Sequence, residues 1–275
     1  MPGQGRSGEF RDSHIWKEDD TWYMLICSGS YTGKGGSALL YKTDRLELLS
    51  DGSIDMDWQY MGPIYEIENQ SMVYGSSWEL PILLPLTNEA GSIEKYMLMI
   101  SPAPASSADN KAYYFLGDFD LESGKFTPDQ AFMEHPALID YGDNVFTGPS
   151  LMVDPVSGKN CVFSIMQDKR SGAEEGASGW AHCVGLTREI YLNEDGSEVC
   201  VKAYEGLKAL EGEVLIDEVG SFTLNEANEL LKKASGDLLH VTVAMEGKTD
   251  GQMGISLKSK GEKTATKLWY ERGKI

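Results

Sequence analysis

The sequence is poor in positive charge. It contains 24 Lys and Arg residues against 43 Asp and Glu residues, which gives a formal net charge of −19. A surface of that sign repels nucleic acid and anionic membranes, so the charge balance argues against both as partners. A neutral polar substrate is compatible with such a surface, and sugars are the most obvious class.

Cysteine, histidine and long apolar runs are also scarce. The cysteines form no Cys-x-x-Cys pair, and their spacing to the four histidines is not that of metal ligands; they are Cys27, Cys161, Cys183 and Cys200. We therefore expect reduced, mostly buried thiols in a reducing compartment, with no metal and no cofactor. No stretch has the length and apolarity of a membrane span, and the opening MPGQGRSGEF has no apolar signal-peptide core. A cytoplasmic location is expected.

Helical patterns are nearly absent, whereas strand patterns are frequent. Only residues 224–235 (LNEANELLKKAS) have apolar residues at helical spacing. Runs rich in β-branched and aromatic residues, separated by turn sequences such as TGKGG, DGS and NEDG, predict strands; they cover residues 21–30, 37–44, 95–104, 111–120, 160–168 and 182–192. The sequence predicts an all-β protein with a minor helix.

A coarse repeat runs through the first two hundred residues. FRD at 10–12, WELP at 78–81 and DYGDN at 140–144 recur at separations of 67 (79 − 12) and 61 (140 − 79) residues. A unit of that length holds about four short strands, which suits a propeller blade with long loops. Residues 1–200 are therefore predicted to form about three blades of a partial β-propeller.

Two carboxylic acids stand out in this repeat. Glu79 lies in GSSWELPILLPL between Trp78 and an apolar run, and Asp12 follows Arg11 in GEFRDSHIW. An ordinary Glu at a strand end points to water, and an ordinary Arg-Asp pair is a surface ion pair. The alternative is an acid that a dry environment keeps protonated near neutral pH, working with a second carboxylate that the adjacent guanidinium keeps ionised.

The ordered set of motifs resembles glycoside hydrolase family 32, the invertases, fructanases and levanases. That family carries Arg-Asp-Pro and Glu-Cys-Pro at the starts of successive blades, matched here by Arg11-Asp12 and Glu79. Further matches in the same order are YYFLGDFD, LIDYGDNVFTGPSLM, GWAHCVGLTREIYLNEDG and VKAYEGLKAL. The resemblance covers about residues 9–218. It implies a partial five-bladed β-propeller followed by an incomplete β-sandwich, with residues 201–275 as connector and truncated sandwich.

The resemblance also implies roles for individual residues. Glu79 would be the general acid/base, and Asp12 the carboxylate that stabilises the transition state and binds fructose hydroxyls. Arg11, Trp78 and Phe146 would contact the substrate, a sucrose-like or oligosaccharide fructoside. Trp180 is expected in the core rather than as a platform for sugar.

The match is incomplete at the residue that would attack the sugar. The family's nucleophilic Asp lies in a Trp-Met-Asn-Asp-Pro-Asn-Gly motif, which does not occur in this sequence. We expect a portion of a retaining β-fructosidase that is inactive alone and is completed by an N-terminal segment or a second chain. Departures at Ser13, Leu80, Asn144, Phe146 and Ile165 leave sucrose, inulin and levan open as substrates, and hydrolysis or fructosyl transfer as reactions.

Two other interpretations stay open. The first is a non-catalytic, carbohydrate-binding propeller that keeps Asp12 and Glu79 without the chemistry. The second is the related five-bladed arabinanases and xylosidases, which also use three acids but fit FRD and the Arg188-Glu189 segment less well. The nucleophile motif in an upstream reading frame would favour the enzyme over the binding protein.

Overall fold

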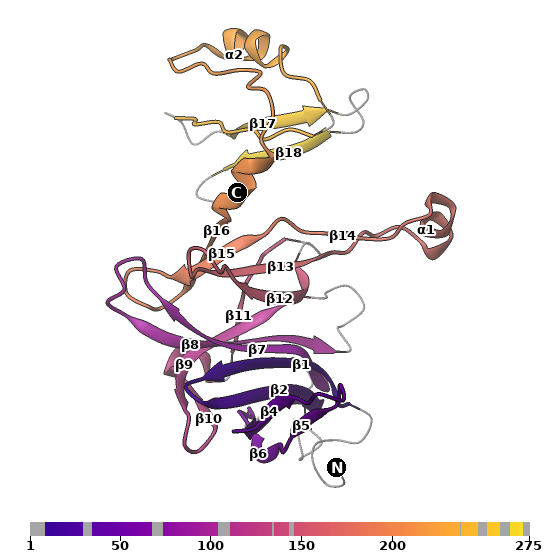
Figure 1. Cartoon of the computed structure of the whole chain (residues 1–275). Helices are drawn as coiled ribbons and strands as arrows, with labels where there is room; N and C mark the ends of the chain where they lie inside the picture. The colour runs from indigo at the N-terminus through magenta and orange to yellow at the C-terminus, as the bar shows by residue number, and fades with distance from the viewer. Residues whose placement is uncertain are drawn as a thin grey trace. The chain divides into compact units, whose positions relative to one another are not determined.

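The computed structural model consists mostly of antiparallel strands, which confirms the all-β prediction (Figure 1). It describes residues 9–29, 35–67, 74–103, 111–133, 135–142, 146–236, 238–246, 252–258 and 265–271. The chain divides into two compact units, Met1–Lys208 and Ala209–Ile275, which are described separately. No helix in the described ranges is both long enough and apolar enough to cross a bilayer.

The first sheet has four strands in the order β1-β2-β3-β6. These are β1 (Arg11–Glu18), β2 (Thr21–Gly29), β3 (Gly36–Thr43) and β6 (Gln59–Pro63), and each neighbouring pair is antiparallel. Between β3 and β6 the chain forms a small separate sheet from β4 (Leu46–Leu48) and β5 (Ile54–Met56). Sequential pairing of this kind is the strand order of a propeller blade.

The second and third sheets repeat this order. The second consists of β7 (Ser77–Thr87), β8 (Glu94–Ala103), β9 (Tyr113–Asp120) and β10 (Lys125–Pro128); β11 (Ala137–Leu138) also pairs with β9, and a 3₁₀ turn, η2, spans Gln130–Phe132. The third consists of β12 (Thr147–Val153), β13 (Asn160–Met166), β15 (Arg188–Leu192) and β16 (Val199–Ala203), with β14 (Cys183–Val184) on β13. The predicted strand 182–192 is therefore two strands, β14 and β15, which pair with different parts of β13.

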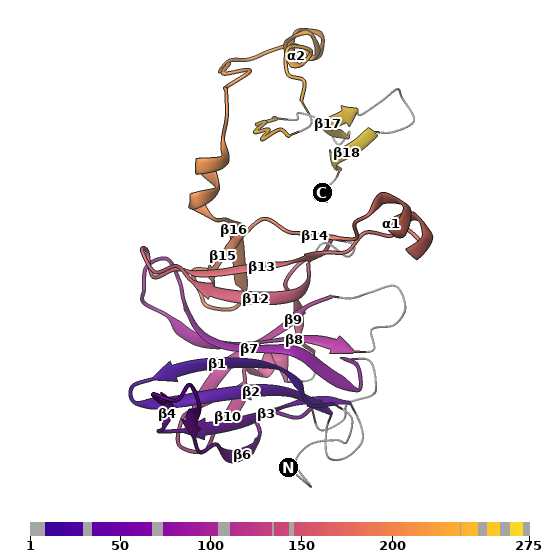
Figure 2. The same ribbon diagram turned by 45° about the vertical axis from the view of Figure 1, so that its right-hand side comes forward.

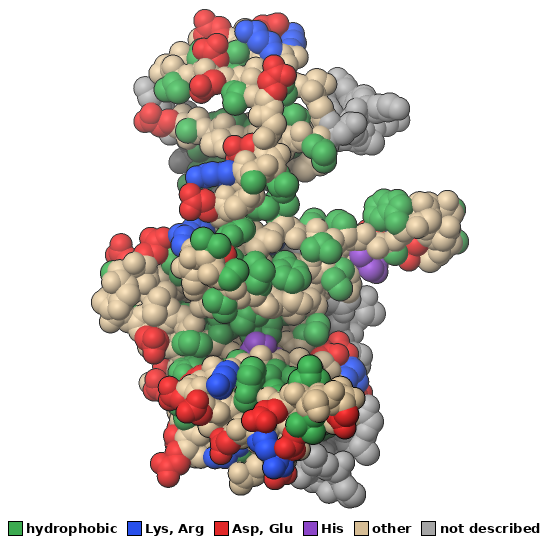
Figure 3. Space-filling view, viewed as in Figure 1, with side chains coloured by type: hydrophobic (Ala, Val, Ile, Leu, Met, Phe, Trp, Pro, Cys, Tyr) green, Lys and Arg blue, Asp and Glu red, His purple; other side chains and the backbone are tan. Residues whose placement is uncertain are grey.

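The three sheets pack face to face around one apolar core. Figures 1 and 2 show them in chain order, with β7 between the first and third sheets. The core combines side chains from all three sheets, including Leu25, Leu83, Leu98, Phe115, Val162 and Ile190, each at most 2% exposed. Figure 3 shows acidic side chains spread over the surface of the first sheet and hydrophobic ones across the sheets above it. Face-to-face packing explains why the central strands are almost continuously apolar.

A β-bulge recurs near the start of the first strand of each of the three large sheets. The ladder shifts register between Arg11 and His14 in β1, between Glu79 and Ile82 in β7, and between Thr147 and Ser150 in β12. The first residues of these bulges are 68 residues apart in both cases (79 − 11 and 147 − 79). The true repeat therefore pairs Arg11, Glu79 and Thr147. The predicted separations of 67 and 61, which paired Asp12, Glu79 and Asp140, were wrong.

The bulges share a backbone conformation that few side chains tolerate. The second residue of each has a positive φ, 55° at Asp12, 47° at Leu80 and 51° at Gly148. This left-handed conformation costs an ordinary L residue about 1–2 kcal/mol, so it persists because the surrounding sheet imposes it. Bulges of this kind bend a strand and redirect the neighbouring side chains. Here they set the direction of Arg11, Asp12 and Glu79.

The second unit has few helices and strands in its described part. A 3₁₀ segment, η3 (Glu205–Leu210), spans the division, and α2 (Leu224–Leu231) and the hairpin β17 (Met253–Lys258) with β18 (Ala265–Tyr270) follow. The helix was predicted and is confirmed, though it ends earlier than residue 235. A reciprocal capping box between Thr223 and Glu226 starts it. No described side chain after Lys208 is buried.

Candidate active site

Two carboxylates from neighbouring blades converge on one guanidinium. Arg11 Nε lies 3.2 Å from Glu79 Oε1 and 3.8 Å from Asp12 Oδ2. These two oxygens are therefore at most 7.0 Å apart (3.2 plus 3.8). Arg11 Nη2 donates a second hydrogen bond, of 2.5 Å, to the same oxygen of Glu79, and Nη1 bonds to Glu9. The sequence interpretation placed Asp12 and Glu79 in one site, and the two carboxyl groups do lie close together.

Glu79 faces a cation rather than a dry apolar wall. Its side chain is 33% exposed and its main described partner is Arg11. The hydrogen bonding that Arg11 donates to Glu79 raises the pKa of Arg11 above its ordinary value, and the negative charges of Glu79 and Asp12 add to that effect. Arg11 therefore stays charged at any physiological pH. The apolar surroundings that the sequence suggested for the Glu79 carboxyl group are not what the structure shows: that group lies beside Arg11 and is one-third exposed.

Trp78 and Phe146 do not lie where a sugar could contact them. Trp78 is 0% exposed; its indole N–H donates to the carbonyl of Tyr74 and its ring packs against Phe115. Phe146 is 3% exposed, with the Arg188 guanidinium 5.0 Å from the ring centroid. Successive strand residues point to opposite faces, so the apolar Trp78 turns into the core when Glu79 faces the site. The prediction that these two rings bind substrate is corrected: both belong to the core.

Two small residues near the acids were not identified from the sequence. Cys27 pairs with Arg11 and Ser101 pairs with Glu79 across their ladders. Burial raises the pKa of the Cys27 thiol to about 12, despite the opposing effect of the Arg11 charge. Ser101 Oγ is the one buried side-chain oxygen or nitrogen without a partner in the described residues. Directly paired residues share a face of the sheet, so both groups lie beside the charged side chains.

The remaining motif residues anchor a loop rather than join the acids. In DYGDN, Asp140 forms an ion pair with Arg188 and accepts the backbone N–H of Gly142. The ion pair joins Asp140 to β15. Asn144 lies outside the described residues. Glu189, 6% exposed, is paired with Lys159 and Lys202 at 3.1 and 3.4 Å, which satisfies a buried charge within the third sheet.

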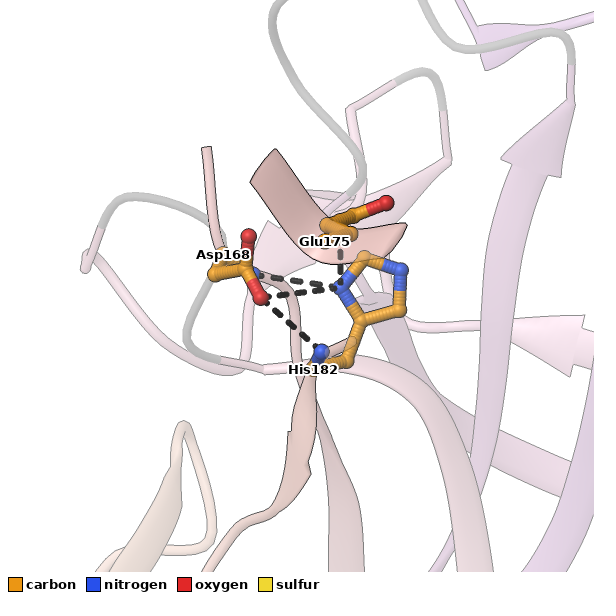
Figure 4. Close-up of side chains that lie close together, drawn as sticks. All are labelled: Asp168, Glu175 and His182. Carbon is orange, nitrogen blue, oxygen red and sulfur yellow. Dashed lines mark hydrogen bonds and ion pairs between the residues drawn. The ribbon is translucent and has the colours of Figure 1, made fainter. Parts of the chain in front are cut away.

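A polar arm projects from the third sheet between β13 and β14. It comprises residues 167–182 and contains the short helix α1 (Gly172–Ser178), which the sequence analysis did not predict (Figures 1 and 2). Asp168, Glu175 and His182 place three potential metal-ligand atoms within 4.8 Å of one another. Figure 4 shows both carboxylates on the Nδ1 side of the imidazole.

This cluster is better explained as a brace for the arm than as a metal site. Asp168 Oδ2 already accepts hydrogen bonds from Arg170 Nη2 at 2.8 Å and from the His182 backbone at 2.9 Å. The Arg170 bond, followed by the His182 N–H, holds the pKa of Asp168 far below its usual range. His182 Nδ1 in turn accepts the Asp168 N–H at 3.3 Å. The atoms that would bind a metal therefore hold the two ends of the arm together.

Trp180, at the end of the same arm, is 56% exposed. The expectation that it lies in the core is wrong. The Arg170 guanidinium stacks on its ring, with Cζ 3.8 Å from the centroid, a separation typical of a cation–π contact. Arg170 is fixed by further bonds to Ser178 Oγ and to the Trp180 carbonyl. One face of the indole is therefore covered by a well-anchored cation.

The fold and the site together define a β-propeller with acidic residues near the starts of its inner strands. The model of the glycosyl hydrolases family 32 N-terminal domain matches residues 1–203. The chain belongs to this family.

Individual relatives agree with that assignment. The chain is 27% identical to a sucrose-6-phosphate hydrolase of Bacillus subtilis (strain 168), covering 75% of this chain and 40% of the relative. It is 25% identical to fructan 1-exohydrolase w3 of Triticum aestivum, covering 94% of this chain and 40% of the relative. A family 32 β-fructofuranosidase of Bombyx mori superposes with a TM-score of 0.60 at 25% identity, covering 78% of this chain and 41% of that structure. The chain thus spans about 40% of the length of these relatives.

Proposed function

We propose that the chain is the acid/base-bearing portion of a β-fructosidase that cleaves terminal fructosyl linkages of sucrose or fructans. The observation that carries the proposal is the convergence of Asp12 and Glu79 on Arg11 from neighbouring blades. Family membership supports it, as do the activities named for the relatives. A Bombyx mori enzyme has been solved with sucrose and a Cichorium intybus enzyme with 1-kestose, so oligosaccharides of fructose are the substrate class considered.

In this proposal the two carboxyl groups have different tasks. Glu79 protonates the departing glycosidic oxygen and then activates water, while Asp12 stays ionised and holds fructose hydroxyls. In the structure the Glu79 carboxyl group is occupied by Arg11. A bound sugar is expected to draw Arg11 toward Asp12 and the sugar hydroxyls, which leaves the Glu79 carboxyl group free to contact the glycosidic oxygen.

The nucleophile is proposed to come from residues outside this sequence. Asp12 is poorly suited to the task, because its bulged backbone fixes it beside Arg11 and because its role as a ligand for hydroxyls does not align it for attack. A retaining glycosidase needs a second carboxylate about 5 Å from the acid. Without it, the 275-residue chain is expected to release fructose very poorly or not at all.

The test compares the chain alone with the chain joined to, or mixed with, a family 32 N-terminal segment that carries the nucleophile motif. Fructose release from sucrose, inulin and levan is expected only in the second case. Glu79→Gln should then reduce kcat by about 10²–10⁴-fold, whereas Glu47→Gln, an exposed glutamate of β4, should leave it unchanged. Binding of fructosides without turnover in the completed protein would instead favour the carbohydrate-binding interpretation.

A further inference from the structure

The arm of residues 167–182 presents one large aromatic side chain on an otherwise polar segment. Its sequence, QDKRSGAEEGASGWAH, contains only alanines as other apolar residues. Helix α1 has no buried residue. An interface for another protein needs a broad apolar centre, which this arm lacks, whereas a single exposed indole beside polar groups suits a ligand with alternating C–H faces and hydroxyl groups.

The indole is held in a fixed orientation. Arg170 covers one face, and its guanidinium bonds to Asp168, Ser178 Oγ and the carbonyl of Trp180 itself. Ser171 and Glu174 cap α1 reciprocally, and the left-handed Gly179 ends it one residue before the tryptophan. Because the ring loses little further freedom on binding, a ligand can stack on the uncovered face at low entropic cost.

The arm leaves the third sheet beside the bulge of β12. This bulge corresponds to those of β1 and β7, which carry Asp12 and Glu79. Ile165, two residues before the arm, pairs with Thr147, the third-sheet counterpart of Arg11 and Glu79. Val184 pairs with Ile165 where the chain returns. Both ends of the arm are thus attached to the end of the third blade at which the inner strand begins. A fructan whose terminal fructosyl unit is held by Asp12 and Glu79 would extend outward from the starts of the inner strands, which is the end of the third blade that carries the arm.

We propose that Trp180 is a stacking platform for the distal sugar units of a fructan, which makes this chain favour polymeric over disaccharide substrates. This inference rests on the proposed function, since it takes the fructosyl end of the polymer to be held by Asp12 and Glu79. The net charge of −19 is compatible with a neutral ligand of this kind. Apolar sugar C–H faces stack on the electron-rich face of an indole, and Arg170 behind the ring fixes which face is available.

The experiment is affinity electrophoresis of the 275-residue chain in native gels containing inulin, levan, dextran or free sucrose. The wild-type chain should be retarded by inulin or levan, and Trp180→Ala should weaken that retardation at least tenfold, with partial recovery in Trp180→Phe. The matched control is Trp269→Ala, since Trp269 is 42% exposed and also has a lysine, Lys267, 5.7 Å from its ring. It should bind as the wild type does.

Each contrary result has a distinct meaning. Equal retardation of wild type and Trp180→Ala, or no retardation of the wild type by any fructan, overturns the platform. Retardation by dextran but not by fructans, lost in Trp180→Ala, keeps a sugar platform but contradicts the proposed fructosidase function. A change of oligomeric state in Trp180→Ala, measured by size-exclusion chromatography with no effect on fructan binding, shows that the indole contacts protein and overturns the inference.

Discussion

At the residue scale, one side chain organises the candidate site. Arg11 contacts Glu9, Asp12 and Glu79, so three carboxylates share one cation. The sequence suggested that Arg11 keeps Asp12 ionised; the structure shows that its shortest bonds to the predicted acids go to Glu79. The carboxyl group of the proposed acid is thereby occupied by a guanidinium, so a substrate that is to contact Glu79 must first displace Arg11.

The first prediction concerns the thiols. At pH 8 a thiol with a pKa of about 12 is ionised in roughly one molecule in ten thousand, and Cys27 is also 0% exposed. Cys183 is exposed. A maleimide added to the native chain should modify Cys183 rapidly and leave Cys27 unmodified, as measured by peptide mass spectrometry. In urea both should react, and fast native labelling of Cys27 would contradict its placement beneath Arg11.

The second prediction tests the position of Trp78. Its indole is fully buried and donates a hydrogen bond to Tyr74, so Trp78→Ala should lower the free energy of unfolding by about 3–5 kcal/mol. Urea denaturation followed by circular dichroism measures this. The control is Trp269→Ala, because Trp269 is exposed; it should change the free energy of unfolding by less than about 0.5 kcal/mol. Trp16→Ala would not serve, because Trp16 also packs against the core. A stability unchanged in Trp78→Ala would place the ring outside the core.

At the element scale, the bulged first strands connect the fold to the site. Much of this level was predictable: six strand runs and the helix α2 follow from apolar periodicity and turn residues. The exact length of the repeat was not predictable. WELP in β7 and TGP in β12 correspond only when the bulged residues Glu79 and Thr147 are aligned, and the sequence analysis aligned acidic residues instead. Nor could the burial of Trp78 and Phe146 be read from sequence, since adjacent apolar and charged residues do not reveal which face of a bulged strand is inward.

The arm of residues 167–182 was also not predictable from the sequence, but here the error was to expect a residue in the core that lies outside it. Its capping-box sequence, Ser171 to Glu174, is a helix-start signal, but seven residues of Gly, Ala, Glu and Ser carry no apolar stripe from which a helix could be inferred. Trp180 seemed a core residue by composition alone. What holds it outside is a local network of Arg170, Asp168 and Ser178, which lie up to 10 residues apart (178 − 168). Such networks become visible only with coordinates.

The third prediction tests the bulge in β12. Gly148 has a φ of 51°, and an added Cβ would meet Ile165 Cδ1 at 3.4 Å and Leu80 Cδ1 at 3.5 Å. Gly148→Ala should therefore destabilise the chain by about 1–2 kcal/mol, mainly through backbone strain. Gly172→Ala provides the control, because this glycine is in α1 with nothing within 4 Å, and it should not be destabilising. Equal stability of the two variants in urea denaturation would show that the bulge relaxes at little cost.

At the scale of the whole molecule, the two units differ in how much they bury. Every buried side chain in the described residues lies in the first unit, where three sheets share one core. In the described part of Ala209–Ile275 no side chain is buried, and many large apolar ones are exposed to more than a third of their area, among them Val219, Phe222, Leu224 and Leu238. Burial of apolar surface is the main stabilising contribution to a folded unit, so the first unit is expected to be stable and the second only marginally so.

The last prediction follows from that difference. Brief digestion with trypsin should cut first after Lys208, Lys232 or Lys233, because local opening is easiest where few apolar contacts must be broken. The expected early product is a fragment that ends near Lys208. Within the three sheets the lysines and arginines should resist cleavage, because they lie in hydrogen-bonded strands or in ion pairs such as Lys95–Asp129 and Arg188–Asp140. Mass spectrometry identifies the fragment. If the first cuts fall inside the strands of the three sheets instead, the three-sheet core is less stable than its burial indicates, and the acids do not belong to a rigid site.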